Sequence, residues 1–308
     1  MPARRSSSAF LNDALTQPPR TLPRRLPIRL TGNTLGLGAS ALRRLDRIGS
    51  RRSDPKRIVA PDLARALTEI SGEIQRQVGV LIDRRGYIHH VIVGDARAVF
   101  LPELSAFRRG QDRLLGLRLV HTHINHEGLT DDDLTDLALL RLDVVAAIEV
   151  IEDGLPGPVH IAHLLPNNAE GDLWEVLPPV SVHDLGDDFE EMIDALIDEF
   201  DRRRKPRPAG DKRVRAILIH VSRKSRGVAE ESLAELRDLA RSAGLDVIHE
   251  IYQRRPVDPK YVMGEGKLKY AVIKAMQLGA EMLVFDLNLS PAQVKAVADY
   301  TDLKVLDR

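Results

Sequence analysis

The sequence predicts an α/β fold, with an α/β domain followed by a small parallel-sheet domain of βαβ type. In the last hundred residues, strand-like and helix-like segments alternate, which is typical of right-handed crossovers in a parallel sheet. Residues 58 to 180 hold short apolar runs and two helical stretches bounded by turn residues. A chain of 308 residues with 43% hydrophobic side chains is also long enough for about two domains.

Composition excludes several classes of protein and site. The chain has no cysteine, so disulfides and thiolate sites are excluded, and His and carboxylate side chains are the metal ligands left. No run of about eighteen apolar residues occurs, so we expect no membrane span. We therefore expect a cytoplasmic protein without a membrane partner.

Charge is distributed unevenly along a chain whose net charge is zero. Residues 1–57 hold 13 Lys and Arg against 3 Asp and Glu, residues 58–211 hold 15 against 29, and residues 212–308 hold 17 against 13. Such blocks are usually solvated faces, but a basic segment also attracts an RNA backbone. Residues 1–57 are predicted to be a basic, partly disordered extension.

The next region, residues 58–180, is predicted to alternate strands and helices. The expected elements are a helix in 62–74, strands at 78–83 and 87–95, a strand at 117–124, a helix at 131–142, and strands at 144–151 and 158–165. The tetrapeptide from Asp83 to Gly86 is predicted to be a hairpin turn between the first two strands.

Two histidines in this region form a candidate metal site. His121 and His123 are two residues apart on one expected strand, so their side chains point to the same face. Asp133 follows one loop later and adds a carboxylate. Two imidazoles and a carboxylate can hold Zn²⁺ with one position open for water, and the alternative is that the histidines only form hydrogen bonds at the sheet end.

Residues 181–211 are predicted to be an amphipathic helix and a basic linker. Apolar residues recur at helical spacing, with acids on the opposite face, so one stripe of the helix should pack against a neighbour. These residues are Phe189, Met192, Ile193, Leu196, Ile197 and Phe200.

Residues 212–308 are predicted to form a parallel sheet. The expected elements are strands at 216–221, 245–253, 281–287 and 304–306, and helices at 231–244, 267–279 and after Ser290, which should cap a helix starting with Pro291. Ligands of such sheets gather outside the carboxyl ends of the strands, where the loop 253–267 and the turn 286–290 follow.

The stretch Gly264 to Lys267, GEGK, has the glycines and lysine of a phosphate-binding loop. The stricter pattern has four residues between its glycines and a Ser or Thr after the lysine, whereas Leu268 follows here. Lys267 at a helix start is suited to a phosphate of a nucleotide or of RNA. The alternative is a helix entry in which the glycines only turn the chain.

Residues 212–308 resemble the N-terminal domain of the HflX family, which are ribosome-associated GTPases. The matching residues, in order, are Gln253, Arg254, Tyr261, Gly264, Gly266, Lys267, Asp286, Leu289, Ser290, Pro291, Gln293 and Val305 to Arg308. Tyr270 departs from the family, which tends to carry a glutamate there.

The resemblance implies binding to the large ribosomal subunit, through ribosomal RNA, and to nucleotide. The residues it implicates are Arg254, Tyr261, Gly264, Gly266, Lys267, Asp286, Ser290 and Gln293. In the family, GTP and Mg²⁺ are bound by a later domain that carries a phosphate loop, a switch and a guanine-reading motif. The phosphate loop and the guanine-reading motif do not occur in these 308 residues, and the one Asp-x-x-Gly match, Asp83 to Gly86, has no phosphate loop before it. We therefore expect no GTP hydrolysis and no catalytic residue in this chain.

Residues 58–180 resemble the MPN (JAMM) domain of RadC proteins and zinc isopeptidases. His121, His123, Thr130 and Asp133 match its His-x-His and Ser-x-x-Asp motif, with Thr130 in place of the serine and a loop one residue shorter. Arg76 stands where the family has its catalytic glutamate, three residues before Gly79. Glu73 is the nearest substitute, and His126 and Glu127 are further ligand candidates.

Three functions therefore stay open. The first is the ribosome-binding N-terminal part of an HflX-type GTP-binding protein. The second is an MPN-type zinc hydrolase, although loss of the glutamate would lower its rate by about a hundredfold or more. The third is a nucleotide-sensing regulator that uses the cleft of the parallel sheet.

Overall fold

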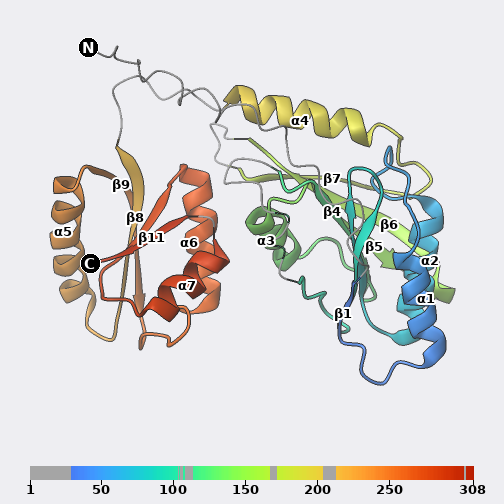
Figure 1. Ribbon diagram of the computed structural model, residues 1–308, viewed down its shortest axis with the longest axis horizontal. Coiled ribbons are helices and arrows are strands. Elements are labelled where there is room, and N and C mark those ends of the chain that lie inside the picture. The colour runs from blue at the N-terminus through green and yellow to red at the C-terminus, as the bar shows by residue number, and fades with distance from the viewer. Residues whose placement is uncertain are drawn as a thin grey trace, which may run out of the picture.

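The protein has an α/β architecture built on two sheets, one of seven strands and one of four (Figure 1). The structure is a computed structural model, and it describes residues 29–308 except 103, 105, 106, 108–113, 167–171, 204–212 and 302. Among the described helices, none is long and apolar enough to cross a bilayer. The predicted α/β class is confirmed, with one mixed and one parallel sheet.

The first sheet is mixed and runs in the order β1-β3-β2-β4-β5-β6-β7. Strands β1 and β3 pair in parallel, as do β4 and β5, and the other neighbours are antiparallel. The elements are β1 (Arg29–Gly32), α1 (Ala39–Gly49), α2 (Pro61–Ile74), β2 (Val78–Asp83), β3 (Ile88–Val93), β4 (Leu117–His123), α3 (Asp131–Leu140), β5 (Val144–Val150), the 3₁₀ turn η2 (Glu152–Gly154), β6 (Pro156–Leu164), β7 (Trp174–Val180) and α4 (Phe189–Arg203).

Local sequence explains where these elements begin and end. Pro61 occupies the first turn of α2, where its missing N–H has no partner to lose, and Gln75 ends the helix in the left-handed conformation. Between β2 and β3 the chain reverses at Gly86, which has a φ of 85°, and Asp83 accepts hydrogen bonds from the backbone N–H groups of Arg85 and Tyr87. The predicted hairpin turn is confirmed.

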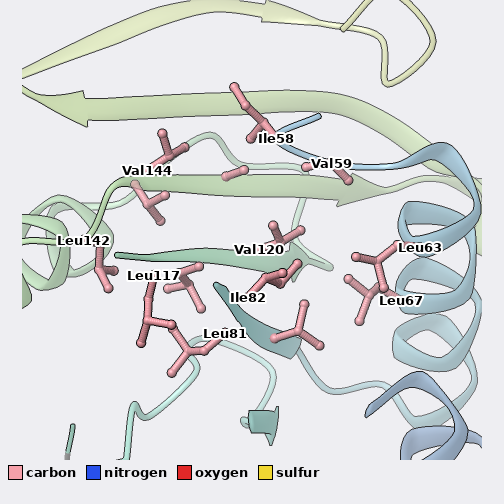
Figure 2. Close-up of a cluster of buried hydrophobic side chains, with 14 of the residues drawn as sticks. Ile58, Val59, Leu63, Leu67, Leu81, Ile82, Leu117, Val120, Leu142 and Val144 are labelled. Carbon is pink, nitrogen blue, oxygen red and sulfur yellow. The ribbon is translucent and has the colours of Figure 1, made fainter. Parts of the chain in front are cut away.

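We call the seven-stranded sheet with its helices the first unit and the four-stranded sheet with its helices the second unit. The core of the first unit lies where α2 covers the central strands. Every residue of β2, β3 and β4 is buried. Figure 2 shows Leu63 and Leu67 of α2 facing the strands that carry Ile82 and Val120. Strands buried on both faces read as continuous apolar runs, as in the sequence VGVLID of β2.

Arg118 is a charged residue inside this core. Its side chain is 1% exposed, and it donates hydrogen bonds to the backbone carbonyls of Ile58, Asp83 and Asp54 at 3.0 to 3.1 Å. The ring of Phe189 lies 4.8 Å from the guanidinium carbon. Burial lowers the pKa of Arg118 to about 10, against the opposing effect of Asp143. One side chain thus links β4 to the segment before α2, to the hairpin and to α4.

The sequence analysis did not anticipate β1, α1 or β7. Strand β1 has four residues at the sheet edge, and β7 contains Pro178 and Pro179, which argue against a strand but are tolerated at an edge. Residues 1–28 of the expected extension lie outside the described residues, whereas β1 and α1 pack on the first unit.

The second sheet is parallel throughout, in the order β11-β10-β8-β9. Its elements are β8 (Val214–Ser222), α5 (Arg226–Ser242), β9 (Leu245–Arg254), α6 (Glu265–Leu278), β10 (Met282–Phe285), α7 (Pro291–Tyr300) and β11 (Lys304–Asp307). Helix α5 packs on one face of this sheet, and α6 and α7 pack on the other (Figure 1). Ser290 caps α7 and Pro291 begins it, as predicted.

Helix α4 precedes the second sheet and packs on the first core. Phe189, Ile193 and Leu196 are buried in the first unit, and Met192, Ile197 and Phe200 pack around them. The apolar stripe of α4 therefore packs against a neighbouring core, as its helical spacing predicted. Within the expected basic linker, residues 204–212 lie outside the described part of the chain.

The two units meet where α3 lies against α6. Asp132 of α3 contacts the ammonium of Lys269 at 3.4 Å, and Leu139 packs against the apolar core of the second unit. Burial raises the pKa of Asp136 to about 7; Asp133 and Asp132 add to this rise, and Lys269 opposes it. The acidic face of α3 therefore carries a carboxyl group that is partly protonated near neutral pH.

We expect Arg118→Met to destabilise the first unit, because three buried carbonyls would lose their donor. The expected loss in the free energy of unfolding is about 2–4 kcal/mol, measured by urea denaturation. Arg202→Met is the matched control, since Arg202 is exposed and donates within its own helix, and it should change stability by less than about 0.5 kcal/mol. Equal midpoints for the two variants would contradict the role given to Arg118.

We expect metal-free protein to lose stability as the pH rises toward 7 because of Asp136. Its folded pKa of about 7 exceeds the ordinary 3.8, so between these values the folded state binds more protons and stability falls with rising pH. Each pH unit in this window contributes about 1.4 kcal/mol. From pH 5 to pH 8 the wild type should therefore lose about 2.5–3 kcal/mol more than Asp136→Asn. Equal losses would contradict a carboxyl group whose pKa is raised by burial.

Candidate functional sites

His121, His123 and Asp133 come together as a buried cluster. The two rings meet edge to face with centroids 4.7 Å apart. The Nε2 atoms of His121 and His123 lie 3.4 and 3.5 Å from the two carboxylate oxygens of Asp133. One ligand atom from each residue lies within 4.8 Å of the others, as a bound metal ion requires.

Two local patterns place these side chains. Alternation along β4 puts both histidines on the face turned away from α2, because Thr122 between them bonds to Ser71 of α2 at 2.7 Å. Asp133 is the third residue of α3, where it forms a capping box with Thr130. Its Oδ2 accepts from the backbone N–H and the hydroxyl of Thr130, both at 2.8 Å. Thr130 therefore orients the carboxylate, as a serine would.

Hydrogen bonding and burial set the protonation of the histidines. His123 Nδ1 donates to the carbonyl of Glu127 at 3.1 Å, which turns Nε2 toward Asp133. Burial lowers the pKa of His121 to about 4, with Asp133 opposing the shift and His123 adding to it. The His121 ring is thus neutral at physiological pH, which is the form that binds a metal.

Unsatisfied polar atoms concentrate at this cluster. Both ring nitrogens of His121 are buried without a hydrogen-bond partner, and so are both amide atoms of Gln77. Gly79 pairs with His121 across the strands, and Gln77, two residues before Gly79, is on the same face. Buried polar groups without partners are rare and mark the place of an ion or water. The donor set therefore fits a divalent metal such as Zn²⁺.

The residues in the position of a general base are engaged elsewhere. Arg76 donates to the carbonyls of Asn33 and Leu35 at 2.6 and 3.0 Å. Glu73 forms an ion pair with Arg44. The charged groups of Arg76 and Glu73 are thus bound to partners outside the His121, His123 and Asp133 cluster.

His126 and Glu127 lie in the loop after β4, and neither is a member of the three-residue cluster. Glu127 supplies the carbonyl that holds His123, whereas His126 lies 3.7 Å from Glu149. Glu149 was missed by the sequence analysis: it pairs with His123 in the β4–β5 register and contacts His160 at 2.7 Å. An acid within the apolar run VVAAIEV was the signal that could have found it.

The second sheet presents a C-terminal rim, which we define as residues 254–267 and 286–293, after the carboxyl ends of β9 and β10. Gln293 donates to the carbonyl of Asp258 at 3.0 Å, which joins the two segments. The backbone N–H of Gly264 donates to the side chain of Gln253 at 3.0 Å. The loop 255–264 and the start of α7 therefore lie side by side.

A side chain at position 264 would displace the flexible end of Arg255. A Cβ there would lie 2.3 Å from the Arg255 guanidinium and 3.3 Å from the Gln253 amide. Gly264 also precedes the first turn of α6 and is its N-cap. Gly266 has no neighbour within 4 Å of an added Cβ, so it leaves open space above that turn.

Cationic residues occupy the rim. Lys267 lies in the first turn of α6 with its ammonium 4.1 Å from the ring centroid of Tyr270, so the departure at Tyr270 supplies a cation–π partner where a glutamate would supply an ion pair. Lys260 lies 4.6 Å from the ring centroid of Tyr261. Arg254 ends β9 and is exposed.

Ser290 and Asp286 were both predicted to bind nucleotide or ribosome, and the structure places them in different environments. Ser290 is exposed and forms a capping box with Gln293. Asp286 is buried, and its carboxylate contacts His220 at 2.6 Å and Arg308 at 3.1 Å. The aspartate is thus held inside the sheet end, whereas Ser290 belongs to the rim surface.

Comparison with known proteins finds a match in the last part of the chain. The family model described as GTP-binding GTPase N-terminal matches residues 230–308. Proteins named GTPase HflX match as well: 35% identity over 95 residues in Lacrimispora saccharolytica, 33% over 94 residues in Escherichia coli, and 34% over 94 residues in Flavobacterium psychrophilum. Each match covers 30% of this chain and 22% of the relative's length.

The second unit is therefore related to the N-terminal region of proteins named GTPase HflX. The predicted resemblance is confirmed for residues 230–308. The resemblance of the first unit to the MPN domain stays a prediction.

Proposed function

We propose that this chain is the N-terminal part of an HflX-type, ribosome-associated GTP-binding protein. The observation that carries the proposal is the match of residues 230–308 to the GTP-binding GTPase N-terminal family. In this proposal, residues 212–308 form the binding domain, residues 58–180 a domain of MPN type, and residues 181–211 the helix and linker between them. GTP and Mg²⁺ belong to a domain outside these 308 residues.

The partner we propose is ribosomal RNA of the large subunit in the cytoplasm. RNA binding is dominated by phosphate contacts, which Lys and Arg side chains supply. The C-terminal rim offers Arg254, Lys260 and Lys267, and the N-terminus of α6 adds its unpaired N–H groups. A nucleotide phosphate would use the same groups, so nucleotide sensing is the alternative reading of this rim.

A second candidate function, Zn²⁺ binding by the first unit, is favoured by the unpartnered nitrogens of His121. In this proposal the ligands are His121, His123 and Asp133. Gln77, whose buried amide atoms have no partner, lies on the same face of the sheet as His121. Bound zinc would supply Lewis acidity and lower the pKa of a bound water. Because Arg76 and Glu73 are engaged elsewhere, we propose a metal-binding domain rather than an active peptidase.

We expect Lys267→Ala to weaken co-sedimentation with large ribosomal subunits. Loss of one phosphate contact should lower the apparent affinity about threefold to tenfold and reduce the salt slope by about one. Lys304→Ala is the matched control, since Lys304 begins β11 at the opposite end of the sheet. Equal binding by both variants would contradict the proposal that the C-terminal rim contacts ribosomal RNA. If binding is absent at low salt and a nucleotide binds instead, the regulator reading replaces ribosome binding.

We expect the full chain to retain about one equivalent of zinc after purification without chelator, because its ligands are already assembled. His123→Ala should lose it, while His183→Ala, which removes an exposed imidazole, should keep it. Elemental analysis measures the content, and circular dichroism checks the fold. Less than about a tenth of an equivalent in the wild type would reject the site.

A further inference from the structure

Ser222, His220 and Asp286 form a continuous hydrogen-bonded chain at the end of the second sheet. His220 Nδ1 lies 2.6 Å from Asp286 Oδ2, and His220 Nε2 lies 2.9 Å from the hydroxyl oxygen of Ser222. We propose that Ser222 is a nucleophile that His220 activates and Asp286 positions. This site goes beyond the proposed ribosome binding and does not depend on it.

Charge and hydrogen bonding fix the direction of the proton chain. Arg308 donates to the other oxygen of Asp286 at 3.1 Å, so both carboxylate oxygens accept hydrogen bonds. In the proposed triad His220 donates from Nδ1 to Asp286, and its Nε2 carries the lone pair. The hydroxyl of Ser222 then donates its proton to Nε2. This is the order that a Ser-His-Asp triad requires.

Burial makes the arrangement rigid. His220 is 6% and Asp286 9% exposed, and the backbone N–H of Asp286 donates to the carbonyl of Ile219 at 2.8 Å. Ser222, at the end of β8, is only half-buried. The base and the positioning residue are thus held inside the sheet, while the nucleophile is the member that solvent reaches.

The topology puts this chain at a switch point of the sheet. Helix α5 leads from β8 to β9 on one side, and α6 leads back across β8 to β10 on the other. Open α/β sheets bind ligands outside the carboxyl ends of strands at such a point. His220 and Ser222 are near the carboxyl end of β8, and Asp286 directly follows β10.

The face of the sheet also distinguishes this site from the one next to Lys267. Ala216 and Leu218 of β8 pack with α5, so alternation places His220 and Ser222 on the α5 face. Ile217 and Ile219 pack with Leu268 of α6. The proposed nucleophile therefore lies on the opposite face from α6.

The N-terminus of α5 follows Ser222 closely along the chain and offers donors for a developing negative charge. Helix α5 begins at Arg226, and its N-cap Ser225 makes no side-chain cap bond, so the N–H groups of the first turn have no intrahelical acceptor. A Cβ added to Gly227 would meet nothing within 4 Å, which leaves this turn open. Exposed Arg223 and Lys224 add positive charge. Preorganised donors of this kind stabilise the oxyanion in acyl transfer.

The chemical class of substrate is an acyl ester or thioester on an anionic carrier. The Ser222 oxygen would attack the acyl carbon while its proton moves to His220 Nε2. The bond from the acyl carbon to the leaving oxygen or sulfur then breaks, and the leaving group takes the proton from His220. Water hydrolyses the acyl-serine by the same steps, so the sequence needs no further reactant.

The test uses a fluorophosphonate probe on the full chain. The serine oxygen bonds to phosphorus, fluoride leaves, and intact mass with peptide mapping locates the adduct. We expect one adduct, on Ser222, which Ser222→Ala removes and Ser225→Ala retains, because Ser225 is an exposed neighbouring hydroxyl without a base. Thermal unfolding checks that the variants are folded.

The roles of His220 and Asp286 are tested by rate. His220→Gln and Asp286→Asn should slow labelling by about a hundredfold or more, and the wild-type rate should rise with pH through a single ionisation, which a purely structural histidine would not produce. No adduct on Ser222 in the folded wild type overturns the proposal. Equal labelling of Ser222 and Ser225, or a rate without this pH dependence, also overturns it.

Discussion

Burial of β4 on both faces is the constraint on which the first unit depends. A strand with no contact to water must satisfy each of its polar side chains within the protein or with a ligand. Arg118 meets three backbone carbonyls, Thr122 bonds to Ser71, and His123 bonds to the carbonyl of Glu127. His121 is the member whose nitrogens have no hydrogen-bond partner. The candidate metal centre therefore follows from the same rule that builds the core.

The buried histidine of the second unit, His220, differs from His121 in its hydrogen bonds. His220 has both ring nitrogens engaged, one by Asp286 and one by Ser222, so its environment suits proton transfer rather than metal ligation. The rim around Lys267 is polar and cationic and suits an anionic polymer. One chain thus combines a buried donor set, a basic rim and a hydrogen-bonded serine, and the contact of α3 with α6 links the element that carries Asp133 to the element that carries Lys267.

Patterns within short segments could be predicted from the sequence, and contacts set by strand order could not. The His-x-His spacing on one strand, the cap at Ser290 and the alternation of residues 212–308 depend on neighbours along the chain. Strand β7 was missed because Pro178 and Pro179 argue against a strand, although an edge tolerates them. The contact of His220 with Asp286 spans 66 residues and exists because β10 inserts beside β8 rather than β9. Gln77 escaped notice because nothing in its local sequence reveals the face it shares with His121.

X-ray absorption at the zinc edge of the metal-loaded full chain tests most directly whether unpartnered His121 marks a metal centre. The result we expect is four light ligands at about 2.0–2.2 Å, with the outer-shell scattering of two imidazoles and no sulfur. His121→Ala should reduce the imidazole contribution to one. A spectrum with six oxygen ligands and no imidazole scattering would contradict the centre, and the polar atoms of His121 and Gln77 would then have to be satisfied by water.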